Sequence, residues 1–258
     1  MTPALFIAHG SPMLAVEEDP YARFLHTLGL EFPRPKAVVL FSAHWLSAVQ
    51  RVSEVHQYDT IYDFAGFPDE LCKIQYPASG ERQISKIIEE LFEQNGVVYA
   101  VEEKRGLDHG AWVVLRLLYP DADAPVVALS INPRLAPEEQ YRIGKALRGL
   151  RENGVLLIGS GGTVHNLRAL RWEDDASDEW AVQFDDWLGD RLKRWDLDEL
   201  FHYERLAPHA NLAVPHNGSE HIAPLFYAMG AADDVKRATL LHGSYRYGNL
   251  SQRVWRFG

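Results

Sequence analysis

Histidines are the residues of this sequence whose type and position could do chemistry. The chain has 11 histidines and one cysteine in 258 residues. Five of the histidines stand where a short apolar segment ends or a helical segment begins: His9, His44, His109, His165 and His221. Imidazole binds iron, zinc and copper, and its ordinary pKa near neutral pH lets it accept and donate protons. Brought together, these side chains could form a metal site with its own acid and base groups.

Three of the five follow apolar segments that are typical of buried strands. His9 ends the segment in LFIAHGSP, His44 ends that in VVLFSAHW, and His165 lies in the glycine-rich turn of VLLIGSGGTVHN. Ligands of an open α/β sheet bind beyond the carboxyl ends of its strands. A lone histidine at a strand end is more often a hydrogen-bonded structural residue, but several at one edge of a sheet indicate a shared site.

The other two stand at the starts of helical segments. His109 lies in GLDHGAW, at a loop-to-helix junction, and His221 lies in HNGSEHIAPL. Pro224 has no backbone N–H and is tolerated only in the first turn of a helix, so we expect that helix to begin near Ser219–His221.

The elements that must position these side chains alternate along the chain. Short β-branched apolar segments and longer amphipathic ones predict an α/β fold: a single-domain layered structure, residues 1–258, with a central mostly parallel or mixed sheet flanked by helices. The expected strands are Ala4–Ala8, Ala37–Ser42, Val97–Val101, Pro125–Ile131, Val155–Ile158, Ala238–Leu241 and Arg253–Phe257. The expected helices are Pro20–Leu28, Gln83–Gln94, Gly110–Leu118, Pro137–Glu152, Asp178–Trp195 and Ser219–Met229. The aromatic segment Leu46–Pro77 is expected to be a long loop over one end of the sheet.

Composition excludes several classes of protein. The formal net charge is −10, with 47% hydrophobic residues, and no cluster of Lys and Arg offers a surface for nucleic acid or an anionic membrane. Cys72 alone forms no disulfide framework, and the first residues lack the basic segment of a signal peptide. We therefore expect a cytoplasmic protein that acts on small molecules, as a monomer or a small homo-oligomer.

Several catalytic motifs are absent from the sequence. The segment GSGGTVHN lacks the Lys-Ser/Thr pair of a phosphate-binding P-loop. The chain also lacks the G-x-S-x-G of serine hydrolases and the H-E-x-x-H of zinc proteases. The glycines beside the histidines are expected to let the backbone pass close to a metal or a flat substrate.

Six short motifs, in order, resemble those of the class III extradiol ring-cleavage dioxygenases, in the DOPA 4,5-dioxygenase-like branch. The order and spacing of the set are more specific than any one motif. One departure is Asn217-Gly218-Ser219, where the family usually has Pro-Thr-Pro. The motifs are HGSP at His9, SAHW at His44, DFxGFP at Asp63–Pro68, DHGxW at His109, GSGxxVHNL at His165 and EHxxPL at His221.

The resemblance implies a mononuclear non-haem Fe(II) enzyme that opens a catechol ring beside its two hydroxyls, using O2. A catechol occupies two coordination positions and O2 a third, which leaves three protein ligands on an octahedral iron. His9, His44 and His221 are the best set, although Glu220 could replace His221. His165 is expected near the metal and sometimes on it. With four imidazoles the site would suit zinc, so Zn(II) could occupy the isolated protein.

Proton transfer and substrate binding are assigned by the same resemblance. His109 and His165 are the candidate catalytic residues, and Asp108 could fix the tautomer of His109. The candidate substrate-binding residues include Trp45, Tyr62, Phe64 and Phe67, for which packing in the core is the alternative interpretation. His242 is added to them because it follows the end of the expected strand Ala238–Leu241.

Two other functions use the same histidines. A zinc-dependent hydrolase could activate water on His9, His44, His165 and His221. A metal-storing or regulatory protein would bind metal without catalysis. The first would consume no O2, and the second would tolerate loss of His109 and His165.

Overall fold

The computed structural model describes residues 1–172, 176–215 and 218–258. His216 and Asn217 lie outside the described residues, so part of the loop that departs from the family motif does as well.

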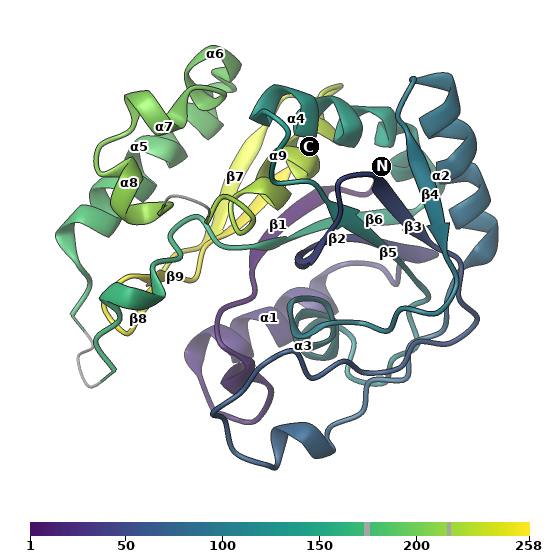
Figure 1. The fold of residues 1–258 in the computed structure, drawn as a ribbon, viewed down its shortest axis with the longest axis horizontal. Helices are drawn as coiled ribbons and strands as arrows, with labels where there is room; N and C mark the ends of the chain where they lie inside the picture. The colour runs from purple at the N-terminus through teal and green to yellow at the C-terminus, as the bar shows by residue number, and fades with distance from the viewer. Residues whose placement is uncertain (173–175, 216–217) are drawn as a thin grey trace.

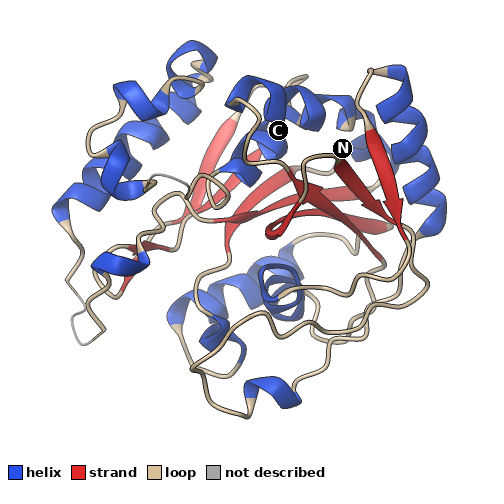
Figure 2. Cartoon of the chain, in the orientation of Figure 1, coloured by secondary structure: helices blue, strands red, loops and turns tan. Residues whose placement is uncertain are grey.

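A mixed sheet of eight strands forms the centre of the described structure (Figures 1 and 2). Its order is β4-β3-β5-β2-β6-β1-β10-β7, and the neighbours of β2 and β6 within it are parallel. These strands are β1 (Ala4–Ala8), β2 (Ala37–Leu46), β3 (Gln50–Ser53), β4 (Tyr99–Glu102), β5 (Val126–Ile131), β6 (Val155–Gly161), β7 (Ala238–His242) and β10 (Val254–Phe257). A separate pair is formed by β8 (Tyr245–Arg246) and β9 (Leu250–Ser251).

Helices cover both faces of the sheet. Side chains alternate between two hydrophobic cores along β1, where Phe6 belongs to one core and Leu5 and Ile7 belong to the other. The core on one face is closed by α1 (Pro20–Glu31) and α3 (His109–Leu118). The opposite core is closed by α2 (Arg82–Gln94), α4 (Pro137–Ala146), α5 (Glu179–Arg194), α9 (Ala223–Gly230) and the short helices α6 (Leu197–Leu200), α7 (Tyr203–Leu206) and α8 (Ala210–Ala213). Within the described residues, 3₁₀ helices span Pro12–Ala15, Leu71–Lys73, Arg148–Asn153 and Leu167–Ala169.

The α/β prediction is confirmed, and several details of it were wrong. The expected helix Pro137–Glu152 ends at Ala146, and a 3₁₀ helix follows at Arg148–Asn153. β2 continues to Leu46, so that His44 lies within the strand rather than after it. The expected loop Leu46–Pro77 contains β3, which pairs with β4 and β5. α9 begins at Ala223, with Pro224 in its first turn, so His221 precedes the helix instead of opening it.

Parallel neighbouring strands bring three histidines to one edge of the sheet: His9 after β1, His44 in β2 and His165 after β6. β6 lies between β2 and β1, with all three in parallel register. His9 therefore follows β1 beside the end of β6, where its N–H donates to the Gly161 carbonyl at 3.0 Å.

In the described ranges, no helix is both long and apolar enough to cross a membrane.

Candidate metal centre and substrate pocket

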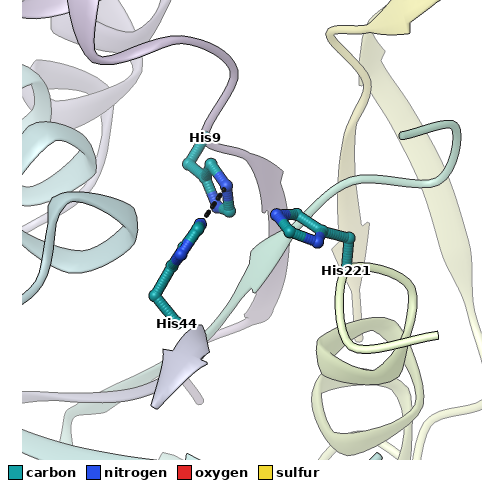
Figure 3. A group of neighbouring side chains, drawn as sticks. All are labelled: His9, His44 and His221. Carbon is teal, nitrogen blue, oxygen red and sulfur yellow. Dashed lines mark hydrogen bonds between the residues drawn. The ribbon is translucent and has the colours of Figure 1, made fainter. Parts of the chain in front are cut away.

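Three imidazoles converge at this edge of the sheet. His9, His44 and His221 each offer a ring nitrogen, and the three nitrogens lie within 4.8 Å of one another. The Nε2 atoms of His9 and His44 are 3.1 Å apart, and the His221 ring points toward them (Figure 3). The ring centroid of His9 lies 4.8 Å from that of His44 and 5.2 Å from that of His221.

Close backbone contacts bring His221 to the end of β6. The Gly162 N–H donates to the His221 carbonyl at 2.7 Å, and a Cβ on Gly161 would lie 2.1 Å from that carbonyl oxygen. Only glycine at position 161 allows the two segments to approach this closely. Glycines beside the histidines were predicted to allow close approach of the backbone to a metal or a flat substrate. At Gly161 the close approach is to the backbone of His221.

An oxygen atom faces the Nδ1 of each of the three rings. For His44 it is Oδ2 of Asp63, at 3.4 Å. His9 Nδ1 is 3.2 Å from Ser160 Oγ, whose proton is donated to the Gly110 carbonyl, so this hydroxyl accepts from His9. His221 Nδ1 is 3.0 Å from Glu220 Oε1. A proton on Nδ1 leaves Nε2 of the same ring with a free lone pair, which is the state that binds a metal.

Burial keeps these histidines neutral. It lowers the pKa of His9 and His221 well below the ordinary value, and the neighbouring imidazoles lower both further. Burial also lowers the pKa of His44 and of His165 to about 4. At neutral pH the cluster therefore presents lone pairs rather than positive charges.

A largely apolar cavity of about 370 Å³ opens beside the three rings. Two further histidines line it. His109 Nδ1 is 2.9 Å from Asp63 Oδ1, so Nδ1 is the nitrogen that donates to this carboxylate. His165 stacks on His221 with ring centroids 3.4 Å apart and planes inclined by 9°. The aromatic side chains in the lining are Phe64, Phe67, Trp172 and Tyr247.

Comparison with known proteins identifies this arrangement. The family described as "Catalytic LigB subunit of aromatic ring-opening dioxygenase" matches residues 3–255. The chain belongs to this family. It is therefore a ring-opening dioxygenase, an oxidoreductase that acts on an aromatic substrate with O2.

Relatives of this dioxygenase cover nearly all of the chain. A protein of Beta vulgaris named "4,5-DOPA dioxygenase extradiol" is 40% identical over 98% of this chain and 95% of its own. A protein of Escherichia coli K12 with the same name is 36% identical over 96% of this chain and 92% of its own. The crystal structure of an uncharacterised protein of Escherichia coli K12 superposes with a TM-score of 0.84, at 31% identity and full coverage of both chains.

The residues of this dioxygenase fit the non-haem metal that its family implies. His221 Nε2 is buried and has no hydrogen-bond partner among the described residues. An unpaired buried nitrogen is costly unless something binds it, and this one faces two more neutral imidazoles. The side chains of His9, His44 and His221 would hold the metal.

The structure brings most of the predicted site residues together, but not all of them. Phe64 and Phe67 join the histidines at the cavity, whereas Trp45, Tyr62 and His242 are not part of its described lining. The three contact other groups instead: Trp45 lies under Arg105, Tyr62 donates to the Ile74 carbonyl, and His242 packs against Tyr21 and Phe24.

Several residues of this site had no role assigned from the sequence. The carboxylate that contacts His109 is that of Asp63, not Asp108, whose oxygens bind Ser42, Arg105 and the Ala111 N–H. Asp63 stands in the DFAGFP motif, which was the available signal. Trp172 and Tyr247 stand in no such motif, and the fold brings them together with ring centroids 4.7 Å apart.

Substitution of Gly110 by alanine is expected to weaken metal binding about tenfold or more. An added Cβ would lie 2.9 Å from His44 Cδ2 and 3.2 Å from His9 Nδ1, so both rings must shift. Competition with a chromophoric chelator measures the effect. Gly149→Ala is the control, because nothing lies within 4 Å of its added Cβ. Equal affinities for the two variants would contradict the expectation.

The metal-free protein is expected to lose stability as the pH falls from about 6.5 toward 4. The folded-state pKa of His44 and of His165 is about 4, below that of the unfolded chain. The unfolded state therefore binds more protons in this window, and stability falls as the pH falls. Thermal unfolding should show a lower Tm at pH 5.5 than at pH 6.5. This difference in Tm should be smaller for His165→Asn than for the wild-type protein. An unchanged Tm in the wild-type protein would oppose this reasoning.

Proposed function

We propose that this chain is an extradiol dioxygenase that cleaves a catechol with O2 at a mononuclear Fe(II) site. The observation that carries the proposal is the group of three imidazoles whose ring nitrogens lie within 4.8 Å of one another beside an aromatic-lined cavity. The names of the relatives support a DOPA-like catechol as substrate. Three imidazoles suit iron and leave coordination positions for other ligands.

The protein contributes binding, orientation and proton transfer to this reaction. When bound, Fe(II) would coordinate the catechol oxygens and O2 and carry electrons between them. Phe64 and Phe67 would pack against the flat ring and exclude water. His109, with its Nδ1 proton directed at Asp63, would accept a catechol proton at Nε2.

His165 would be the second proton carrier. Its position in the cavity lining supports this role, and its pKa of about 4 keeps it neutral and able to accept a proton. Its ring nitrogen also lies within 4.8 Å of ligand atoms of Glu220 and His221. A second role as a metal ligand, including one to Zn(II) in the isolated protein, therefore belongs to the proposal.

The wider setting of the enzyme is part of the same proposal. Residues 1–258 would form one catalytic domain that acts in the cytoplasm as a monomer or a small homo-oligomer. Family membership does not favour the alternative of a zinc-dependent hydrolase.

Anaerobic reconstitution with Fe(II) tests the function directly. The loaded protein should consume one O2 for each DOPA molecule and form a yellow ring-opened product, while zinc-loaded protein should be inactive. A parallel assay with unsubstituted catechol measures how much the amino-acid side chain of DOPA contributes to kcat/KM. Turnover with zinc alone, without O2 uptake, would refute the proposal.

A further inference from the structure

We propose that Asp63 is a positioning residue whose single carboxylate orients two histidines with different tasks. One is the metal-binding His44 and the other is the proton carrier His109. These two tasks rest on the proposed function, whereas the orientation itself rests on the contacts of the carboxylate.

The two oxygens of Asp63 are divided between the two rings. Oδ1 accepts from the backbone N–H of His109 at 2.9 Å and lies 2.9 Å from its Nδ1. Oδ2 lies 3.4 Å from Nδ1 of His44. The two rings are adjacent, with centroids 4.0 Å apart, so one carboxylate reaches both.

This arrangement selects the tautomer of each ring. A carboxylate oxygen accepts hydrogen bonds, so the Nδ1 of His109, 2.9 Å from Oδ1, carries a proton, and Oδ2 at 3.4 Å favours the Nδ1–H tautomer of His44 as well. Nε2 of His44 is then free to bind a metal, and Nε2 of His109 is free to accept a proton.

Asp63 is held in place by the segment that leads into α3. The Ile61 N–H donates to the Leu107 carbonyl at 2.8 Å, and the Leu107 N–H donates to the Asp59 carbonyl at 2.8 Å. The Trp112 indole N–H donates to the Ile61 carbonyl at 3.1 Å. These bonds fix the loop of Asp63 against the helix that begins at His109.

The other nearby carboxylate cannot replace Asp63. Asp108 Oδ1 accepts from Ser42 at 2.6 Å and from the Ala111 N–H at 3.2 Å, and its Oδ2 accepts from Arg105 at 3.2 Å. In the part of the chain that the structure describes, Asp63 is thus the carboxylate available to both imidazoles.

Asp63→Asn separates orientation from a simple structural role. The backbone N–H of His109 keeps the amide oxygen at the position of Oδ1, so the contacts with His109 persist. The amide NH2 then faces His44 and donates to its Nδ1. The proton of His44 must move to Nε2, where it competes with the metal. We expect metal affinity to fall about 10- to 100-fold, with kcat at saturating Fe(II) much closer to wild type.

The experiment measures Zn²⁺ affinity by chelator competition and kcat with Fe(II) for each variant. Asp63→Ala should lower both quantities. Asp69→Asn, an exposed residue in the same loop, should change neither. Wild-type zinc affinity in Asp63→Asn would overturn the proposal, because a residue that only anchors the loop is replaced well by asparagine.

A second measurement needs no variant at this position. Nitrogen-15 NMR of the imidazoles in the zinc-loaded wild-type protein should show Nδ1–H tautomers for both His44 and His109, and an Nε2–H form of either would overturn the proposal. Failure of the proposed function would give a different result. Wild-type protein with Fe(II) would consume no O2, while Asp63→Asn would still weaken zinc binding.

Discussion

His9→Ala is expected to abolish metal binding and, with it, the consumption of O2. The His9 ring adjoins both of the other imidazoles proposed to bind the metal, with ring centroids 4.8 Å from that of His44 and 5.2 Å from that of His221. Its loss leaves two ligands and a cavity that water can enter. Loss of a group that only supports a ligand costs about 10- to 100-fold in metal affinity, so loss of a ligand itself should cost more than about 100-fold.

Metal content after Fe(II) reconstitution and desalting measures this effect. His242→Ala is the matched control, because this histidine packs against Tyr21 and Phe24 and is not part of the described lining of the cavity. The control should keep its metal and its turnover. A His9→Ala protein that retained one equivalent of iron would show that the metal lies elsewhere.

His109→Ala is expected to lower kcat by about 10² to 10⁴, the usual contribution of an acid–base residue. The metal should remain bound, because the three metal-binding rings are untouched and Asp63 still faces His44. Stopped-flow measurement of product formation at saturating iron and catechol gives kcat. Added imidazole should restore part of it by entering the vacated space.

The same variant separates an enzyme from a metal-storage protein. Storage requires the metal ligands alone, so His109→Ala would then leave metal binding intact and have no turnover to lower. An unchanged kcat in His109→Ala would remove this residue from the mechanism. A variant that also lost its metal would show that His109 supports the metal site rather than proton transfer.

The fold could be predicted from the sequence where the residue pattern of a single segment indicates its structure. The apolar segment Ala4–Ala8 became β1 with the same bounds, because both faces of that strand are buried. β3 was missed because Gln50–Ser53 is short and mostly polar. Its extended form depends on pairing with β4 and β5, which no local pattern reports.

The residues of the site likewise differ in whether the sequence could predict them. The histidines were visible because a metal site uses a rare residue type at the ends of strands. The groups that orient them were not, because Ser160 and Asp63 are ordinary residue types whose role depends on which ring they reach. The cavity wall made by Trp172 and Tyr247 joins distant segments, and sequence spacing does not predict that contact.

The central place of β1 in the sheet has a consequence for the order of events during synthesis. This strand leaves the ribosome well before its partners β6 and β10. His9 must likewise wait for His221, which precedes α9. An emerging chain therefore holds β1 and His9 without these partners until late in translation, and cannot assemble the proposed metal centre until His221 has been made.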